Sequence, residues 1–499
     1  MTSADRMPAR QARLGPVMNH PGLTSPVQDM NWHSWTANDG VQALALLALL
    51  SYCVTAAITG PFRWAVGLVG LTPIIYFPQI LMLGSTLAVV VWESRQGLQP
   101  LRAMTLLVIS YSILVGLFHT PVYQVLFGIY TLLPFWFGLS CSEIIFKHWH
   151  LVFKTSVWLW LVVVTGVILN YWIAYPWEGF GYSVGDLDVV SSREWENIGG
   201  GKRLAGFSRA SFDAALQTLL LGVIVVMGTR SVWLRLLIWS ITFLTIYMTT
   251  SKGVYNVFAI LSPVVILGQK IPSSAIRWWP LALGLVALLL PMTPLFMDVN
   301  FYIRDQELAN LTFSFWDRLN DMWPNAWKLL ENQGSSLWGR GLGGIGTPQT
   351  YFEFNRFNAA DNIFVYWFVI FGWVALPGFL LLLLRSLRLN PWRDPVEAAA
   401  YCLLLATLIY GITANVVESG FFAIAAGMAH VGSAFVKHFE RRGRKPGAQA
   451  DVYRRGRDGQ HARPHRQPAH QRGPHIGQEP GPVRQRAQEH EHQVAGDLA

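Results

Sequence analysis

The sequence predicts an all-α polytopic membrane protein with about 12 transmembrane helices. Its 499 residues are 52% hydrophobic and only 13% charged, whereas ordinary soluble domains carry roughly 25% charged residues. The chain has 22 Trp and 28 Phe, and such rings favour the boundary between lipid and water. Its apolar residues also fall into repeated windows of about 20, the length that a helix needs to cross a bilayer. A soluble protein of this size would need far more Lys and Glu on its surface.

Twelve windows qualify as membrane spans. They are residues 41–59, 66–92, 101–119, 121–141, 155–175, 208–227, 231–249, 253–268, 278–296, 362–385, 397–417 and 419–437. The second window is long and contains Pro73 and Pro78, and proline is tolerated in transmembrane helices but kinks them. This window is therefore either one kinked, tilted helix or a pair of spans, and the count near residues 62–93 stays open.

Basic residues fall on one side of the predicted membrane. With twelve spans, alternate loops contain Arg95 and Arg102, Lys147 and Lys154, Arg230 and Arg235, Lys270 and Arg277, and then Arg385, Arg388 and Arg393. The N-terminal segment and the C-terminal tail share that side. Because Lys and Arg collect in cytoplasmic loops, we predict that both termini are cytoplasmic and that the protein lies in the cell inner membrane. The net charge of +9 then reflects orientation, and nucleic acid is not a predicted partner.

This topology divides the chain into five segments. They are a cytoplasmic N-terminal segment (1–40), transmembrane helices 1–9 (41–296) with an outer loop at 176–207, a large periplasmic loop (297–361), transmembrane helices 10–12 (362–437) and a disordered basic cytoplasmic tail (438–499). The tail cannot bury a core because it has almost no large apolar residues. Its composition also resembles out-of-frame translation of a GC-rich gene.

The loop 297–361 is too long for a simple connector, and loops of such length usually bind ligands or catalyse. Within it, the segment from Asp317 to Glu331 spaces its apolar residues helically. Trp323, Trp327 and Leu330 should therefore share one helix face.

Charged residues at the outer ends of the predicted helices are the candidates for chemistry, because a charge near lipid is costly unless it has a function. They occur in KRLAGFSRASFDAA (Arg203), TTSKG (Lys252), FWDRLNDMW (Arg318), LWGRGLGGIG (Arg340 and Gly343), NAADNIF (Asp361 and Asn362) and NVVESGFF (Glu418). A reaction that expels a diphosphate needs cations that neutralise the leaving group. It also needs a carboxylate that accepts a proton from the attacking hydroxyl.

Each candidate also has a structural interpretation. Lys252 could extend its charge to the interface while its stem lies in lipid, and Asp361 could cap a helix N-terminus. Arg318 could form a surface ion pair with a neighbouring aspartate, which would contribute little. Arg340 could be an exposed loop residue.

Several other patterns are expected to be structural. The run GRGLGGIG contains G-x-G-x-x-G, but the dinucleotide motif needs a preceding strand and a βαβ unit. Its glycines are expected to allow a tight bend or a close approach to a ligand. Asp186-Leu187-Asp188 could bind a metal, although we interpret it as a polar loop segment. The cysteines lie in apolar windows and should pack there, without disulfides or metal: Cys53, Cys141 and Cys402.

The outer segments of residues 200–385 resemble the O-antigen ligase and polymerase superfamily (Wzy-like and WaaL-like proteins), especially exopolysaccharide polymerases of the xanthan type. The resemblance rests on RLAGFSRASFDAA, TSKG, the Arg318 helix, GRGLGGIG, and ADN followed by FGWVALPG. Two positions depart from the family pattern. The family usually has Arg where Lys252 stands, and Lys keeps the charge but loses the bidentate fork. The ligases have His where Asp361 stands, which favours polymerase over ligase.

The resemblance implies an inverting, metal-independent glycosyltransferase without a cofactor, which acts on undecaprenyl-diphosphate-linked oligosaccharide. It implies Asp361, Arg318 and Lys252 as catalytic residues. The substrate-binding residues would be Arg203, Arg340, Gly343, Asn362 and Glu418. Membrane lipid and other polysaccharide export proteins are the further expected partners. The alternatives are a ligase that transfers glycan to a lipid or protein, a transporter (flippase) of lipid-linked oligosaccharide, and a non-catalytic organising subunit. Against the transporter, the chain shows no evident internal repeat.

Overall fold

The computed structural model describes residues 37–96, 100–184, 187–194, 201–267, 271–297, 306–387, 389 and 394–429. The predictions for the N-terminal segment before residue 37 and for the tail 438–499 lie outside these residues, and so does Asp186. Everything below concerns the described part of the chain.

Eight helices in this part are long and apolar enough to cross a membrane: Asn38–Ala57, Thr72–Arg95, Val122–Lys147, Trp149–Asn170, Ser211–Gly228, Val232–Thr249, Ser274–Leu295 and Ile363–Ser386. Four shorter apolar helices are Ala103–His119, Lys252–Leu267, Pro395–Gly411 and Gly420–Ala429. Each of the predicted windows overlaps one of these helices. This confirms the class of an all-α polytopic membrane protein, whereas twelve crossings and cytoplasmic termini stay predictions.

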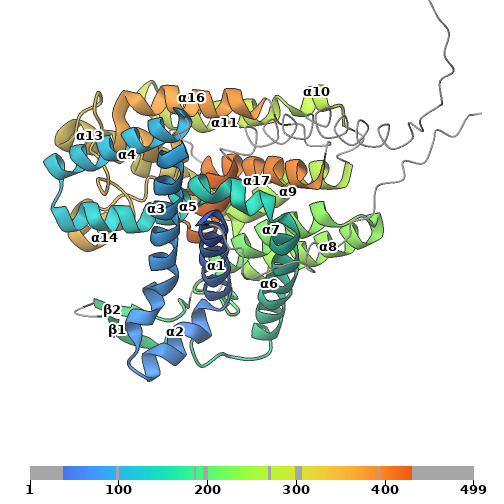
Figure 1. The fold of residues 1–499 in the computed structure, drawn as a ribbon. Helices are drawn as coiled ribbons and strands as arrows, with labels where there is room; N and C mark the ends of the chain where they lie inside the picture. Colours follow the sequence, from blue (N-terminus) through green and yellow to red (C-terminus); the bar gives the residue numbers. More distant parts are fainter. Residues whose placement is uncertain are drawn as a thin grey trace, which may run out of the picture. The chain divides into compact units, whose positions relative to one another are not determined.

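The central helices of the bundle are α7 (Ser211–Gly228) and α17 (Pro395–Gly411) (Figure 1). The apolar window of α7 is 83% buried, against 28% for the first span and 33% for α8 (Val232–Thr249). Four helices pack around α7, namely α6 (Trp149–Asn170), α8, α9 (Lys252–Leu267) and α17. Outer helices instead expose large apolar side chains, such as Leu107 and Phe118 of α4 (Pro100–His119), as expected where helices contact lipid.

The long second window contains one spanning helix and an adjoining short one. A 3₁₀ turn, η2 (Thr72–Tyr76), leads directly into α3 (Phe77–Gln96), and together they form one candidate span, Thr72–Arg95. Before it lies α2 (Thr59–Leu68), which follows α1 (Ala37–Ala57) and was not foreseen. Ten residues of helix reach about 15 Å, half of the hydrocarbon thickness, so α2 cannot cross the membrane.

The predicted outer loop 176–207 forms a two-stranded antiparallel hairpin, the only sheet among the described residues. Strand β1 (Gly181–Val184) pairs with β2 (Leu187–Val190), with Gly181 opposite Val190. The hairpin lies beside α2 and η2 (Figure 1). Its contacts therefore bring this loop against the turn between the first two spans.

The large loop before the tenth predicted span is mostly helical. Its elements are α12 (Gln306–Asp317), η5 (Arg318–Met322), α13 (Trp323–Gln333), α14 (Thr347–Phe352) and the 3₁₀ turn η6 (Phe354–Arg356). The predicted shared face is confirmed, because Trp323, Trp327 and Leu330 are all buried. Element η5 is a single π-helical turn between α12 and α13, a feature that is frequent at functional sites.

The three cysteines are buried among apolar side chains, as predicted. After the large loop, the chain continues through α15 (Ile363–Phe371), η7 (Gly372–Val374) and α16 (Ala375–Ser386) to α17. Helix α11 (Trp279–Leu289) and η4 (Leu290–Leu295) precede the large loop and pack against α17, α16 and α13.

Candidate functional site

One large cavity of about 1660 Å³ opens among the predicted outer loops and the ends of the helices that they join. Pockets for small molecules are usually about 300–1,000 Å³, so this cavity can take a larger ligand. Its charged lining is mostly basic: Arg63, Arg193, Lys202, Arg203, Arg209, Lys252 and Arg318, against Asp213, Asp361 and Glu418. All five predicted charged candidates outside the glycine-rich loop thus line one cavity: Arg203, Lys252, Arg318, Asp361 and Glu418.

Arg318 and Asp361 form an ion pair in the wall of the cavity. The Nη2 atom of Arg318 lies 2.6 Å from Oδ2 of Asp361. Its Nε donates to the carbonyl oxygen of Thr413 at 2.8 Å, and its Nη1 donates to that of Ser314 at 2.5 Å. Because Arg318 begins the π-helical turn η5, its guanidinium joins α12 to the residues after α17. The predicted alternative of a pair with a neighbouring aspartate in sequence is therefore wrong.

Asp361 does not cap the following helix. The cap of α15 is Asn362, whose Oδ1 accepts hydrogen bonds from the backbone N–H groups of Phe364 and Val365 at 2.8 and 3.0 Å. Asp361 itself has a left-handed backbone with φ 38°, and Ala360 before it has φ 64°. Non-glycine residues rarely adopt this conformation, which is often found at functional sites. The strained turn directs the Asp361 carboxylate to Arg318.

Burial raises the pKa of the Asp361 carboxyl, and Asp317 adds to this effect, while the charge and hydrogen bond of Arg318 oppose it. From the sequence, a helix N-terminus would lower this pKa and an apolar surface would raise it. In the structure, burial has the largest effect, and the pKa of Asp361 is raised. A carboxylate with a raised pKa accepts a proton more readily.

Lys252 and Arg203 also line the cavity. Lys252 is the first residue of α9, and Thr250, two residues before it, has a φ of 55° that makes a tight turn after α8. Arg203 is half-buried, and burial lowers the pKa of its guanidinium, an effect that Tyr410 opposes. Tyr410, near the end of α17, lies within electrostatic range of four charged groups of the cavity: Asp361, Asp213, Arg318 and Arg203.

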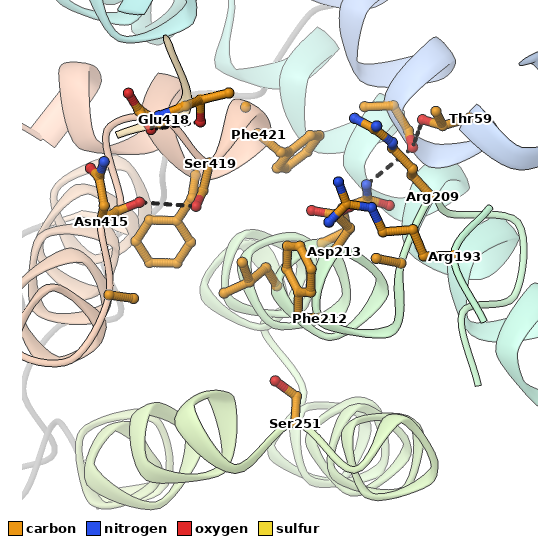
Figure 2. A pocket seen from close by; sticks show the side chains of 18 of the residues that line it. Thr59, Arg193, Arg209, Phe212, Asp213, Ser251, Asn415, Glu418, Ser419 and Phe421 are labelled. Atoms are coloured by element: carbon orange, nitrogen blue, oxygen red, sulfur yellow. Dashed lines mark hydrogen bonds between the residues drawn. The ribbon is translucent and has the colours of Figure 1, made fainter. Parts of the chain in front are cut away.

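Glu418 lines the cavity, but its oxygens are used within the protein (Figure 2). Oε2 accepts hydrogen bonds from the backbone N–H and the hydroxyl of Thr347 at 2.9 and 2.7 Å. Oε1 accepts one from the hydroxyl of Tyr366 at 2.9 Å. Burial raises the pKa of Glu418, and the bonds from Thr347 and Tyr366 oppose this. Glu418 therefore fastens α14 and α15 to the turn after α17.

Three predicted substrate-binding residues lie outside the cavity lining. Arg340 is 1% exposed and pairs with Glu353 at 2.6 Å, so it is also not the exposed loop residue of the alternative interpretation. Gly343 has φ 83°, and a Cβ there would lie 2.6 Å from the carbonyl oxygen of Gln124. The amide of Asn362 is buried and donates to the carbonyl oxygens of two helix ends, Ala287 and Ile412. These residues hold the fold together around the site.

The glycine-rich run packs against the protein's own helices. The N–H of Leu342 donates to the carbonyl oxygen of Ser112 in α4 at 2.8 Å. The side chain of Gln124 in α5 (Val122–Lys147) donates to the carbonyl oxygen of Gly343 at 2.9 Å. The glycines therefore allow a close approach to α4 and α5. From the sequence, a close approach to a ligand was one of the two expected reasons for them.

Comparisons with models of protein families, with curated proteins and with solved structures found no match to this chain. Its function must therefore be argued from the residues and their geometry.

Five charged residues of the cavity were not predicted from the sequence: Arg63, Arg193, Lys202, Arg209 and Asp213. Arg209 and Asp213 lie inside RLAGFSRASFDAA, the segment that was chosen for Arg203. Arg63 lies between the first two apolar windows, on the predicted outer side, where the positive-inside pattern disfavours a cation. That exception was the signal that could have identified it.

Proposed function

We propose that this protein is a membrane glycosyltransferase that polymerises lipid-linked polysaccharide repeat units, in exopolysaccharide or O-antigen biosynthesis. The observation that carries the proposal is the cavity of about 1660 Å³, whose lining has seven basic and three acidic residues and includes the Arg318–Asp361 ion pair. A large polyanionic saccharide substrate fits such a lining. The predicted outer location of the cavity also agrees with a lipid-linked substrate that is presented at the membrane surface.

In the proposed reaction, a hydroxyl group of one undecaprenyl-diphosphate-linked saccharide attacks the anomeric carbon of another. Asp361 accepts the hydroxyl proton as the new C–O bond forms. The bond between the anomeric carbon and the diphosphate oxygen breaks, and undecaprenyl diphosphate leaves with the electron pair, so that the carbon inverts. Arg203, Lys252 and Arg318 neutralise the charge that develops on the leaving group, which is where positioned cations accelerate a reaction most.

The ion pair suits this sequence of events. In the resting state Arg318 balances the Asp361 carboxylate. When Asp361 takes the proton it loses its charge, and the guanidinium becomes available to the diphosphate that is leaving at the same moment. One side chain would thus stabilise the base before the transition state and the leaving group during it.

The decisive experiment adds a purified undecaprenyl-diphosphate-linked repeat unit to the purified protein in lipid nanodiscs. Chains of increasing length support a polymerase. Transfer of the glycan to a lipid or protein acceptor without chain growth would instead establish a ligase. The absence of both products would indicate a transporter or an organising subunit. Movement of the lipid-linked saccharide across liposome membranes would then distinguish those two.

A further inference from the structure

Four aromatic rings form a continuous row in the wall of the cavity. They belong to Tyr76 of η2, Phe127 and Tyr130 of α5, and Tyr351 of α14, and all four residues line the cavity. We call them the aromatic row. The ring centroids are 5.8 Å apart for Tyr76 and Tyr130, 5.6 Å for Tyr130 and Phe127, and 5.0 Å for Phe127 and Tyr351. The row therefore joins three segments that are far apart in the sequence.

The elements that carry the aromatic row are packed against one another. Helix α14 lies beside α5 (Figure 1), and α3, into which η2 leads, also packs against α5. Phe127 and Tyr130 are three residues apart in α5, so their side chains share one helix face. Phe352 of α14 also contacts Phe127, with ring centroids 6.2 Å apart, but it does not line the cavity. Phe352 therefore supports the row and leaves the four rings at the cavity.

The rings at the two ends of the aromatic row are the most open. Tyr76 is 37% exposed and Tyr351 is 41% exposed, whereas Phe127 and Tyr130 are half-buried. The interplanar angles along the row are 67°, 47° and 58°, so no ring has a neighbour stacked parallel on its face. Apolar surface that stays in contact with water is unfavourable, and a ligand that covers these rings would remove that cost.

Neutral polar side chains accompany the rings. Gln79, Thr131 and Thr350 line the cavity, and the two threonines are adjacent in sequence to Tyr130 and Tyr351. The Nε2 atom of Gln79 lies 3.5 Å from the hydroxyl of Tyr130. Its Oε1 atom has no hydrogen-bond partner among the described residues. A buried acceptor without a partner is costly, and a hydroxyl group of a ligand would supply the missing hydrogen bond.

Aromatic rings beside neutral polar groups suit a carbohydrate. One face of a pyranose ring carries C–H groups with slightly positive hydrogens, and the face of an aromatic ring is negative. The two faces therefore attract each other and exclude water. The hydroxyl groups at the edge of the sugar need hydrogen-bond partners when they leave water. Charged side chains alone would not provide the apolar face.

A position at the membrane interface is the alternative explanation for exposed aromatic residues, because Tyr and Trp gather there. Tyr123 fits that explanation. It lies on α5 one turn before Phe127, is exposed and does not line the cavity. Tyr76 and Tyr351 differ from Tyr123 because they line the cavity and belong to the aromatic row. Tyr123 therefore provides a matched control.

We propose that the aromatic row is a saccharide-binding subsite, at which pyranose rings of the glycan stack on Tyr76, on Tyr351 and on the rings between them. This inference rests on the proposed function, which makes the substrate a chain of sugar residues. Because the row has four rings, it offers places for more than one sugar. A growing chain therefore stays in contact with the row while further units are added.

The test uses the full-length protein in nanodiscs and the repeat-unit oligosaccharide, released from its lipid by mild acid. This probe has neither lipid nor diphosphate, so it reports on sugar binding alone. Ligand-observed NMR measures the affinity, and it also detects stacking, because protons held over an aromatic face shift upfield. The wild type should bind the probe, with upfield shifts of the C–H protons of at least one sugar ring.

Three variants separate stacking from other roles of the rings. Tyr76→Leu/Tyr351→Leu keeps apolar side chains but removes two aromatic faces, so the affinity should fall about tenfold and the upfield shifts should decrease. Tyr76→Phe/Tyr351→Phe keeps both faces and should bind nearly as the wild type does. Tyr123→Ala, the matched control, should leave the affinity and the shifts unchanged. Thermal unfolding checks that each variant is folded.

The proposal is overturned if the wild type does not bind the probe, or if the folded double leucine variant binds it as tightly as the wild type. An equal loss of affinity in the double phenylalanine variant would show that the hydroxyl groups bind the sugar, and it would also overturn stacking.

The subsite and the proposed function can fail independently. A wild type that binds the probe through the rings but makes no polymer would support the subsite and overturn the proposed function. A double leucine variant that makes polymer at the wild-type rate and of the wild-type length would leave the proposed function intact and overturn the subsite.

Discussion

The Arg318–Asp361 ion pair allows a sharp test of the proposed mechanism through Asp361→Asn. This substitution removes the carboxylate but keeps an oxygen that can accept the Nη2–H bond now at 2.6 Å. Arg318 also keeps its bonds to the carbonyl oxygens of Thr413 and Ser314. Helix α15 keeps its cap, because Asn362 provides it. The variant should therefore fold.

The structure sets the expected magnitudes. The side chains of Arg318 and Asp361 are 17% and 20% exposed, and removing one partner of a buried ion pair typically costs about 3–5 kcal/mol. Because the amide still accepts a bond and Arg318 retains two others, we expect a smaller loss of about 1–2 kcal/mol. Loss of the general base should slow polymerisation about 10²–10⁴-fold. Chain growth from a lipid-linked repeat unit measures the rate, and thermal unfolding measures the stability.

Asp317→Asn is the matched control for this test. Asp317 is close enough to affect the charge of Asp361 but does not line the cavity, so its loss should change the rate only a few-fold. Asp361→His should keep part of the activity, because it places another proton acceptor at the same position. A folded Asp361→Asn protein that polymerises at the wild-type rate would refute the assignment of the base.

Three further results are expected. Because burial raises the pKa of Asp361 above its ordinary value of 3.8, polymerisation should decline as pH falls through the raised value. The folded state also binds the proton of Asp361 more tightly than the unfolded state does, so the contribution of this residue to the free energy of unfolding should decrease as pH rises from 3.8 through the raised value. If Asp361→Asn leaves the pH dependence of the rate and of the stability unchanged, both effects are excluded. Cysteines placed at the exposed Glu194 and Ser314 should react with an impermeant label outside intact spheroplasts, and reaction only after permeabilisation would reverse the topology. Arg340→Met should lower the free energy of unfolding by about 3–5 kcal/mol, because Glu353 loses the partner that holds its pKa below the usual range against the effect of burial; thermal unfolding close to wild type would contradict this.

The sequence predicted the spans well because a membrane helix depends on one local property, the length of an apolar run. It did not predict which of two adjacent residues caps a helix, because that depends on the backbone conformation of each residue. Asp361 and Asn362 are both good capping residues, and only the left-handed backbone at Asp361 assigns the cap to Asn362. Composition alone could not distinguish the two.

Long-range packing explains the other failures. The glycine-rich run after Arg340 has the pattern of a ligand loop, but two of its bonds join it to helices more than 200 residues earlier in the chain: Leu342 to Ser112 and Gly343 to Gln124. Arg63 was not singled out because it lies between the windows 41–59 and 66–92, and an average over either window does not detect the short helix α2 that contains it. Its partners, Tyr182 and Arg209, also come from distant segments.

Because of the π-helical turn at Arg318–Met322, the Arg318–Asp361 ion pair depends on the number of residues in that turn. A π-helical turn contains one residue more than the equivalent α-helical turn, and each residue of an α-helix corresponds to a rotation of about 100°. Deleting one residue from the turn would restore a regular helix and rotate α12 against α13. Arg318 would then point away from Asp361 although every functional residue remained in the chain. Insertions and deletions here are therefore a route by which related proteins could lose the ion pair without a substitution at either residue.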